Sequence, residues 1–475
     1  MSSSSSSSKP WTTDLKQLLT KNQITMRQFL LSLLLTLVVV TIGCKPANHH
    51  ATPIGDSFVT PEVADVVMYQ VNPRVFAPSN SLQAIQGRLD SIQDLGVNML
   101  WIMPIYPIGE EKSKNSPYSV RDYKAVAPEY GTIDDLRTLV EACHERGMGV
   151  ILDWVANHTA WDNVWVTQHP DWYTHDSVGD IIYPPGTDWT DVADLNYDNL
   201  DMRAAMIDAM RFWVDSVGVD GFRCDVADQV PVDFWTECIS TLRAAAKPRS
   251  LIMLAEGSNP ENFEAGFDLN YAWEFMRAIA EVMKGDARVN RLIAVDKNEY
   301  KDLERGKYKL RFTTNHDEAT KASPVTLYGG AKASMAAFVA TTMLHGGMLV
   351  YGSQEVGYPE TINFFHYVPV DWNANPGMRD EYKKLIAIYN EHPSLRSSGK
   401  AITFDDDENN VLIVDRVLNN DNVLVVVNVR DAAHNVELPA MWADKVVTNL
   451  MTNSEMKLTK HLTLQPYQYM LLHNK

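Results

Sequence analysis

The sequence has little positive charge, few cysteines and no apolar run long enough to cross a membrane. Lys and Arg number 42 against 60 Asp and Glu, and the formal net charge is −18. Because no basic tract offsets this charge, the composition argues against a protein that tracks nucleic-acid phosphates, and nucleic acid is not an expected partner. The mostly apolar run from Phe29 to Ile42 has 14 residues, whereas a helix that crosses a bilayer core needs roughly 20.

Cysteine is scarce, with 4 residues in a chain of 475. Cys44 follows the apolar run, and Cys143, Cys224 and Cys238 remain, an odd number. No CxxC pair or Cys/His cluster suggests a zinc site. We expect the last three thiols to be reduced and buried, where they act as small apolar side chains.

The N-terminus has the pattern of an export signal. Met26-Arg27-Gln28 precedes the apolar run, whose length suits the hydrophobic region of a signal peptide, and the run ends in Gly43-Cys44. A small residue followed by cysteine resembles the lipobox of bacterial lipoproteins, where the cysteine is lipidated. Residues 1–44 are therefore predicted to be an N-terminal extension with a lipoprotein-type signal peptide, and residues 45–60 a tether. An uncleaved anchor or an ordinary secretory signal is the alternative, and Met26 is an alternative start.

This pattern predicts an exported bacterial lipoprotein. Lipidation at Cys44 would give the chain a membrane partner through an N-terminal lipid anchor. The rest of the chain would then lie in the periplasm or at the cell surface.

From Asp65 onward, short apolar runs alternate with helical patterns. Most of these runs lack the alternation of a half-buried strand, as expected of parallel strands covered on both faces. Eight such runs over about 330 residues predict an α/β fold, a (β/α)8 TIM barrel at residues 61–393 with a short loop insertion at 159–198. The predicted strands are Val66–Val71, Met99–Met103, Gly149–Asp153, Val219–Asp225, Leu251–Glu256, Phe267–Leu269, Leu310–Asn315 and Met348–Tyr351.

Two helical stripes lie between these runs. Thr132 and Asp135 have the spacing of a capping box, and Leu136, Leu139, Val140 and Cys143 then share one face. Met206, Ala209, Met210 and Trp213 form the second stripe. Both are expected to pack against the barrel.

The alternation of strand-like and helical segments stops after Pro393, and no strong helical pattern follows. Short strand-like runs are separated by turns that contain Asn and Asp. Residues 394–475 are therefore predicted to form a small C-terminal antiparallel β-sandwich domain. Its predicted strands are Ala401–Phe404, Val411–Val417, Val423–Val429, Lys445–Asn449 and Tyr467–Leu472.

Polar residues gather where the predicted barrel strands end. Asp225 ends the fourth strand, Glu256 the fifth, and Asp317 follows the seventh. An isolated carboxylate is usually a solvated charge or a helix cap, but the C-terminal strand ends of a barrel share one rim, where active sites lie. Two carboxylates across a pocket can cleave a glycosidic bond, one as nucleophile and one as proton donor.

The neighbouring residues assign the roles. Arg223 lies two residues before Asp225, so both side chains point to one side of the strand, and the guanidinium is expected to lower the pKa of Asp225. Glu256 follows an apolar run, and a dry setting would favour its protonated form. Asp225 is thus predicted to be the nucleophile, Glu256 the acid/base and Asp317 a third carboxylate. His158 and His316 are candidate donors to sugar hydroxyls, or structural histidines.

The blocks DWVANH, GFRCD, AEG and TTNHD together resemble the signature regions of the α-amylase family, glycoside hydrolase family 13. They contain Asp153–His158, Gly221–Asp225, Ala255–Gly257 and Thr313–Asp317. The resemblance implies a retaining glycosidase that forms a covalent glucosyl-enzyme. It also implies that Tyr118 stacks on the sugar, with Arg223, His158 and His316 around it, and carboxyl groups about 5–5.5 Å apart.

Three departures limit the resemblance. Asp228 and Gln229 stand where classical α-amylases have Lys and His, and Asn196 stands where an aspartate is frequent. Asn157 matches a usual calcium ligand, which makes calcium a candidate cofactor, but a calcium cage needs about six to eight oxygens. The segment after the third strand is short, which predicts an open cleft.

The expected substrate is an α-glucan or malto-oligosaccharide, with α-1,4 bonds cleaved in starch-derived glucans, maltodextrins or cyclodextrins. A transglycosylase or isomerase with the same intermediate, or an α-glucosidase, is the alternative. A non-catalytic glycan-binding surface protein is the alternative from another class, and it is disfavoured because Asp225, Glu256 and Asp317 are all present.

Overall fold

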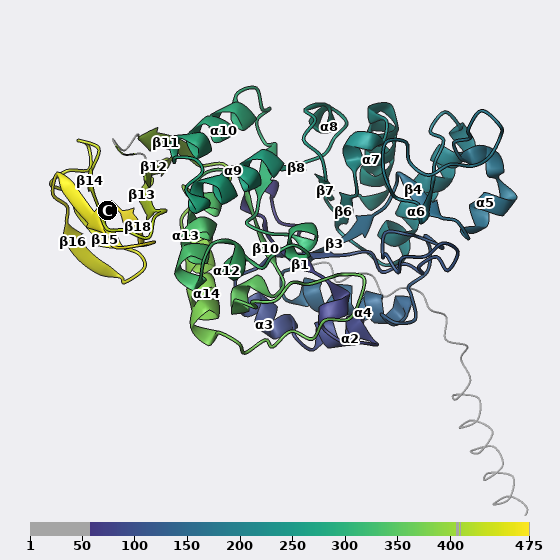
Figure 1. Ribbon diagram of the computed structural model, residues 1–475, viewed down its shortest axis with the longest axis horizontal. Helices are drawn as coiled ribbons and strands as arrows, with labels where there is room; N and C mark the ends of the chain where they lie inside the picture. The colour runs from purple at the N-terminus through teal and green to yellow at the C-terminus, as the bar shows by residue number, and fades with distance from the viewer. Residues whose placement is uncertain (1–57, 405–407, 409, 475) are drawn as a thin grey trace, which may run out of the picture. The chain divides into compact units, whose positions relative to one another are not determined.

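The structure is a computed structural model that describes residues 58–404, 408 and 410–474 (Figure 1). These residues belong to one compact unit. The predicted signal, Cys44 and most of the predicted tether lie outside the described residues. Within the described part of the chain, no helix is long and apolar enough to cross a membrane.

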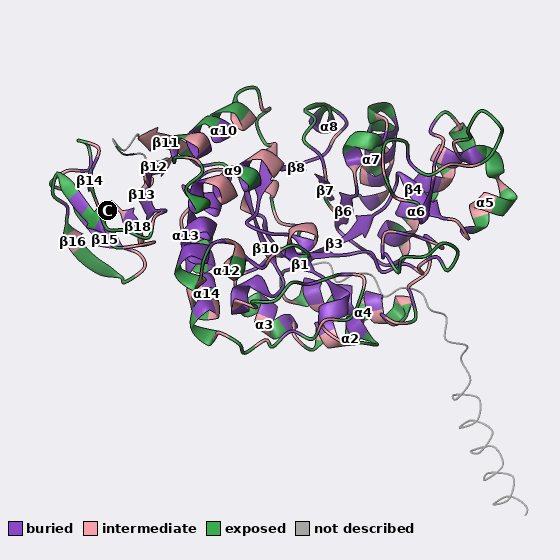
Figure 2. Ribbon diagram, in the orientation of Figure 1, coloured by how far each residue is buried: buried purple, intermediate pink, exposed green. Residues whose placement is uncertain are grey.

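Eight parallel strands form a closed barrel, which confirms the predicted fold class. Their order around the barrel is β1-β10-β9-β8-β7-β6-β3-β2. They are almost entirely buried, as Figure 2 shows in purple. The strands are β1 (Val67–Val71), β2 (Met99–Ile102), β3 (Gly149–Trp154), β6 (Gly221–Cys224), β7 (Ile252–Ala255), β8 (Leu269–Tyr271), β9 (Tyr308–Arg311) and β10 (Gly347–Tyr351).

Helices connect the strands and bury their apolar faces. The capping box at Thr132 and Asp135 is present, and the stripe around Met210 is buried, as the sequence predicts. The helices are α2 (Ser81–Gln86), α3 (Leu89–Asp94), α4 (Ile133–Glu145), α5 (Val164–Gln168), α6 (Leu200–Ser216), α7 (Val232–Ala246), α8 (Glu261–Glu264), α9 (Trp273–Lys284), α10 (Asn290–Tyr300), α11 (His316–Ala319), α12 (Pro324–Leu327), α13 (Ala331–Thr342) and α14 (Pro376–Glu391). Cys143, Cys224 and Cys238 are buried and free.

The barrel interior is filled by side chains from alternate positions of the strands. Met68, Trp101, Ile151, Leu254 and Leu349 belong to one buried cluster inside the barrel. Because the interior is packed, polar side chains can meet a substrate only at a rim.

Several predicted strands run too far at their ends. β6 ends at Cys224 and β7 at Ala255, so Asp225 and Glu256 lie one residue beyond their strands. Their backbone amides still continue the ladder, since Asp225 donates to Trp154 and Glu256 donates to Cys224. The seventh barrel strand, β9, ends at Arg311, and the side chain of Asn315 caps α11. Each shift carries a functional side chain out of the packed barrel toward the rim.

The C-terminal part is an antiparallel β structure, as predicted. One sheet has six strands in the order β11-β12-β13-β18-β15-β16, and β14 pairs with β17. Side chains of both sheets share one buried cluster, which makes a sandwich. The strands are β11 (Lys400–Phe404), β12 (Val411–Leu418), β13 (Asp421–Asn428), β14 (His434–Glu437), β15 (Val446–Asn449), β16 (Ser454–Lys457), β17 (His461–Leu464) and β18 (Tyr469–His473). The sequence prediction misses β14, β16 and β17, which have only four residues each.

Candidate active site

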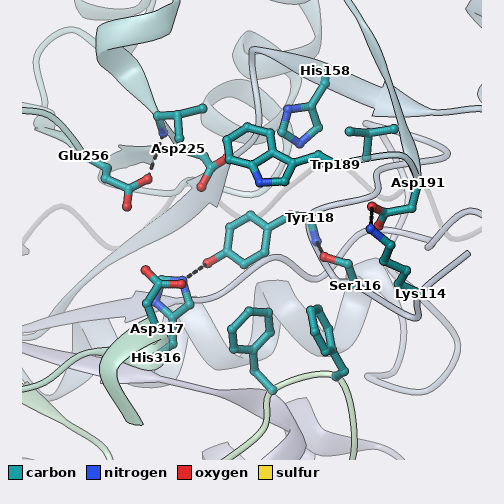
Figure 3. Close-up of a pocket in the computed structure, with 14 residues that line it drawn as sticks. Lys114, Ser116, Tyr118, His158, Trp189, Asp191, Asp225, Glu256, His316 and Asp317 are labelled. Atoms are coloured by element: carbon teal, nitrogen blue, oxygen red, sulfur yellow. Dashed lines mark hydrogen bonds and ion pairs between the residues drawn. The ribbon is translucent and has the colours of Figure 1, made fainter. Parts of the chain in front are cut away.

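A cavity of about 370 Å³ lies where the barrel strands end (Figure 3). All three predicted carboxylates line it, and so do Tyr118, His158 and His316. The full lining set is Lys114, Ser116, Tyr118, His158, Trp189, Asp191, Val192, Asp225, Val226, Glu256, His316, Asp317, Phe364 and Phe365. Arg223 is fully buried beneath them.

Arg223 joins the carboxyl groups at the floor of the cavity. Its Nη1 donates to Asp153 Oδ1 at 2.7 Å and to Asp225 Oδ1 at 2.8 Å. Its Nη2 forms an ion pair with Glu256 Oε2 at 2.9 Å. The prediction that Arg223 and Asp225 share one side of the strand is confirmed. One buried cation therefore faces three buried or nearly buried acids.

Arg223 lowers the pKa of Asp225, as predicted, but burial outweighs this effect and the net pKa is raised. Burial raises the pKa of Asp225, Arg223 opposes this, and the nearby charge of Asp153 raises the pKa further, to about 6. The sequence shows the cation but neither the depth of burial nor the second acid. Asp225 is still largely ionised at neutral pH.

Glu256 holds its proton more tightly than Asp225. Burial raises the pKa of Glu256 to about 8, while Arg223 opposes this and the charges of Asp225 and Asp317 add to it. The direction agrees with the prediction of a dry setting. Two acids with pKa values on either side of neutrality are suited to separate roles as base or nucleophile and as acid.

The backbone after Asp225 also contacts Glu256. Val226 adopts a left-handed conformation, with φ of 37°, which is strained for a β-branched residue. In this conformation its N–H donates to Glu256 Oε2 at 2.9 Å. The strained turn thus ties the ends of β6 and β7 together at the two principal acids.

Asp317 is the most open of the three predicted carboxylates. Its side chain is 38 % exposed, and its Oδ1 lies 3.3 Å from His316 Nε2. Asn315 Nδ2 donates to its Oδ2 at 3.4 Å. The carboxylate is therefore available to contact a bound molecule.

Tyr118 and His316 form one wall of the cavity. The Tyr118 hydroxyl lies 2.7 Å from His316 Nε2 and donates to Asp153 Oδ2 at 3.1 Å. His316 Nδ1 lies 2.8 Å from Gln70 Nε2. Burial lowers the pKa of His316 to about 4, so the ring is neutral at pH 7. The two rings stack with their centroids 5.4 Å apart, and both side chains line the cavity.

His158 and Asn157 follow β3. Burial lowers the pKa of His158 to about 4, so this ring is neutral as well. Asn157 Nδ2 lies 3.3 Å from His158 Nδ1, and the Asn157 carbonyl accepts the amide of Leu195. Among residues 58–404, 408 and 410–474, His158 does not belong to any group of three or more His, Cys, Asp or Glu that has the spacing of metal ligands. Asn157 does not by itself make a calcium cage, and calcium stays a prediction.

Sequence reasoning missed several residues of the site. Asp153 lies in the DWVANH block but is fully buried, and only the fold shows that it contacts Arg223, Trp101 and Tyr118. Phe364 and Phe365 come from a loop after β10 that has no regular pattern. No signal in the sequence identifies them.

The short segment after β3 contributes one wall of the cavity. Trp189 lies with its ring beside that of His158, at 5.5 Å. Asp191 forms an ion pair at 3.3 Å with Lys114, which lies in the loop after β2. The segment thus supplies an aromatic side chain, Trp189, and an ion pair, Asp191–Lys114, to the lining of the cavity.

Asp228 serves the loop that carries Glu256. Its Oδ2 accepts the amide of Ser258 at 2.8 Å, and its Oδ1 accepts Asn262 Nδ2 at 2.8 Å. A Cβ added at Gly257 would lie 2.1 Å from Asp228 Oδ1, so this approach requires glycine. Asp228, where classical α-amylases have Lys, therefore holds the loop after β7 in place.

A closed (β/α)8 barrel with paired acids, a buried arginine and aromatic walls at its carboxyl rim has the features of a glycoside hydrolase. The family profile described as "Alpha amylase, catalytic domain" matches residues 70–177 and 171–410. "Maltogenic Amylase, C-terminal domain" matches residues 402–471. The chain belongs to the alpha-amylase family and is an alpha-amylase-type glycosidase.

Similar proteins carry related descriptions. A cyclomaltodextrinase of Geobacillus thermopakistaniensis is 25% identical over an alignment that covers 90% of this chain and 79% of that protein. The crystal structure of the noncanonic maltogenic alpha-amylase AmyB from Thermotoga neapolitana has a TM-score of 0.79 and 25% identity, covering 87% of this chain and 99% of its own. An alpha-amylase structure from Lactobacillus plantarum has a TM-score of 0.79 and 27% identity, covering 87% and 100%.

Proposed function

We propose that this protein is a retaining hydrolase of α-1,4-glucosidic bonds in starch-derived glucans, maltodextrins or cyclodextrins. The observation that carries the proposal is the single guanidinium of Arg223 in contact with both Asp225 and Glu256. Such contact supports a close pair of acids, as a retaining mechanism requires. The cyclomaltodextrinase and maltogenic relatives support the class of substrate.

In the first half of the reaction, Glu256 gives its proton to the glycosidic oxygen as the bond to the anomeric carbon breaks. An oxygen of the Asp225 carboxylate attacks that carbon and forms a covalent glucosyl-enzyme. In the second half, Glu256 takes a proton from water, and the water oxygen displaces Asp225. Two displacements restore the α configuration, and both acids return to their starting state.

The other residues bind and orient the sugar. Tyr118 offers its aromatic face as a platform for the reacting glucose, and neutral His158 offers a hydrogen bond to a sugar hydroxyl. The two nitrogens of neutral His316 already contact Gln70 and Tyr118, so a sugar hydroxyl that bonds to His316 would replace one of these contacts. Asp317 adds a negative charge near the positively charged transition state, which would stabilise it. Trp189 extends the aromatic surface beyond this glucose.

The test is product analysis on maltoheptaose with the Glu256→Gln variant beside it. Proton NMR during the first turnovers should show new reducing ends in the α form, and Glu256→Gln should bind maltodextrin without turnover. Glu261→Gln, an exposed glutamate on α8, is the matched control and should remain active. Initial β products or full activity of Glu256→Gln would refute the assigned roles.

The same assay separates hydrolysis from sugar transfer. An acceptor sugar such as glucose is added, and transfer products are measured against free maltose and glucose. A hydrolase releases mainly free sugars at low acceptor concentration. Dominant transfer products would identify the transglycosylase alternative, which shares the glucosyl-enzyme.

We further propose that the chain is exported and lipidated at Cys44. The support is the apolar run Phe29–Ile42 followed by Gly43-Cys44. The full chain should partition with membranes, and Cys44→Ala should move it to the soluble fraction. Identical soluble fractionation of both forms would rule out the lipid anchor.

A further inference from the structure

Two histidines and one aspartate from distant parts of the sequence meet away from the cavity. His392 follows the end of α14, Asp421 begins β13, and His473 ends β18. α14 follows the last barrel strand, whereas β13 and β18 are neighbours in the C-terminal sheet (Figure 1). None of the three residues lines the sugar cavity. The proposed glycosidase mechanism does not use them.

The donor atoms have the spacing of a metal site. Asp421 Oδ1 lies 2.9 Å from His392 Nδ1 and 3.3 Å from His473 Nε2. One ligand atom from each residue lies within 4.8 Å of the other two. Metal–nitrogen bonds of about 2.0–2.1 Å in a tetrahedral site separate neighbouring donor atoms by about 3.3 Å. The cluster can thus close on one ion with small shifts of the two imidazole rings.

A backbone group holds the aspartate in place. The amide of Ser394 donates to Asp421 Oδ2 at 2.9 Å, which leaves Oδ1 directed at the two imidazoles. Such second contacts orient the ligands of metal sites. The side chains of His392, Asp421 and His473 are 12 %, 18 % and 24 % exposed, so an ion and a water ligand can reach them.

We propose that His392, Asp421 and His473 bind one divalent transition-metal ion, with Zn²⁺ as the best fit and water in the fourth position. Two imidazoles and one carboxylate suit zinc, whereas Ca²⁺ requires about six to eight oxygen ligands. The ion would fasten the end of α14 to two strands of the C-terminal sheet. It would therefore stabilise the fold without taking part in catalysis.

The experiment measures Zn²⁺ binding to the metal-free full chain by isothermal titration calorimetry. The background carries His49→Ala and His50→Ala, because these adjacent histidines could also bind the ion. We expect one ion per chain, and at least a tenfold loss of affinity in His392→Gln, His473→Gln and Asp421→Asn. His461→Ala is the matched control, because His461 is exposed in the same β region and should leave binding unchanged.

Two further readouts complement the calorimetry. Co²⁺ in place of Zn²⁺ should give the intense visible absorption of a tetrahedral site, and His473→Gln should remove it. Zn²⁺ at 100 times its Kd should raise Tm by roughly 3 °C, while CaCl2 should not. Equal Zn²⁺ affinity in the parent and Asp421→Asn, which is nearly isosteric, would overturn the proposal. So would an equal response to Ca²⁺.

Discussion

Replacing Arg223 by lysine should shift the pH dependence of kcat/KM, and not only lower its maximum. In the wild type, kcat/KM should fall as the pH drops through about 6, where Asp225 gains a proton. It should also fall as the pH rises through about 8, where Glu256 loses one. Both limits belong to a coupled group of acids, so the profile reports the group as a whole.

The size of the shift follows from the contacts of the guanidinium. Arg223 stabilises the ionised form of Asp225 through a hydrogen bond of 2.8 Å. Such a bond to a charged group contributes about 1.5–3 kcal/mol, equivalent to a change in pKa of about 1–2. A lysine ammonium cannot keep all the contacts of the planar guanidinium. The acidic limit should therefore move to about pH 7–8, and the ionised fraction of Asp225 at pH 7 should fall from about nine tenths to between one tenth and one half.

The assay is kcat/KM on an aryl α-maltoside between pH 4.5 and 10. Both limits should move to higher pH, because Arg223 lowers the pKa of Glu256 as well. Arg223→Gln removes the cation altogether and should cost about 3–5 kcal/mol in stability. Arg243→Lys, on the exposed side of α7, is the control with an unchanged profile. If Arg223→Lys lowered kcat/KM at every pH but left the acidic and basic limits unchanged, the electrostatic role of Arg223 would be refuted.

Three other changes test single parts of the site. Tyr118→Ala removes the aromatic platform and should raise KM for maltodextrins at least tenfold, a loss of about 1.4 kcal/mol in binding free energy. Initial rates measure this KM, and an unchanged KM would contradict the role of Tyr118 as a platform. Asp228→Ala removes the acceptor for the Ser258 amide. Loss of this hydrogen bond should raise the activation free energy by about 1 kcal/mol and so lower kcat about fivefold, with little change in Tm. An unchanged kcat would show that this contact does not position Glu256. If Asn157 helps to bind calcium, EDTA should lower Tm and CaCl2 restore it, and Asn157→Ala should lose this response; a Tm insensitive to both treatments would argue against calcium.

The barrel and its rim were predictable because both depend on local patterns. All eight predicted barrel runs contain or overlap a strand, because most of these buried parallel strands are nearly continuous in apolar residues. The exceptions are β8 and β9, which contain polar residues, and there the predicted runs share only Leu269 with β8, and Leu310 and Arg311 with β9. Asp225 and Glu256 were placed at neighbouring strand ends, where the ladder does bring them together. The three strands of the C-terminal domain that the prediction misses have only four residues each, too few to establish a pattern, although β17 alternates exposed and buried residues.

What the sequence could not supply depends on contacts between distant segments. The net pKa of Asp225 reflects burial and the charge of Asp153, which lies 72 positions earlier. Trp189 and Phe364 reach the cavity from irregular loops. The cluster of His392, Asp421 and His473 has no motif spacing at all, because three separate elements assemble it.

The most direct test of the central claim is to identify the residue that becomes glucosylated. The protein is treated with 5-fluoro-α-glucosyl fluoride, which slows breakdown of a glucosyl-enzyme, then digested and analysed by mass spectrometry. The account predicts one added fluoroglucosyl group, on the peptide that contains Asp225, and none in Asp225→Asn. A label on any other carboxylate, or turnover of the reagent without a covalent adduct, would contradict it.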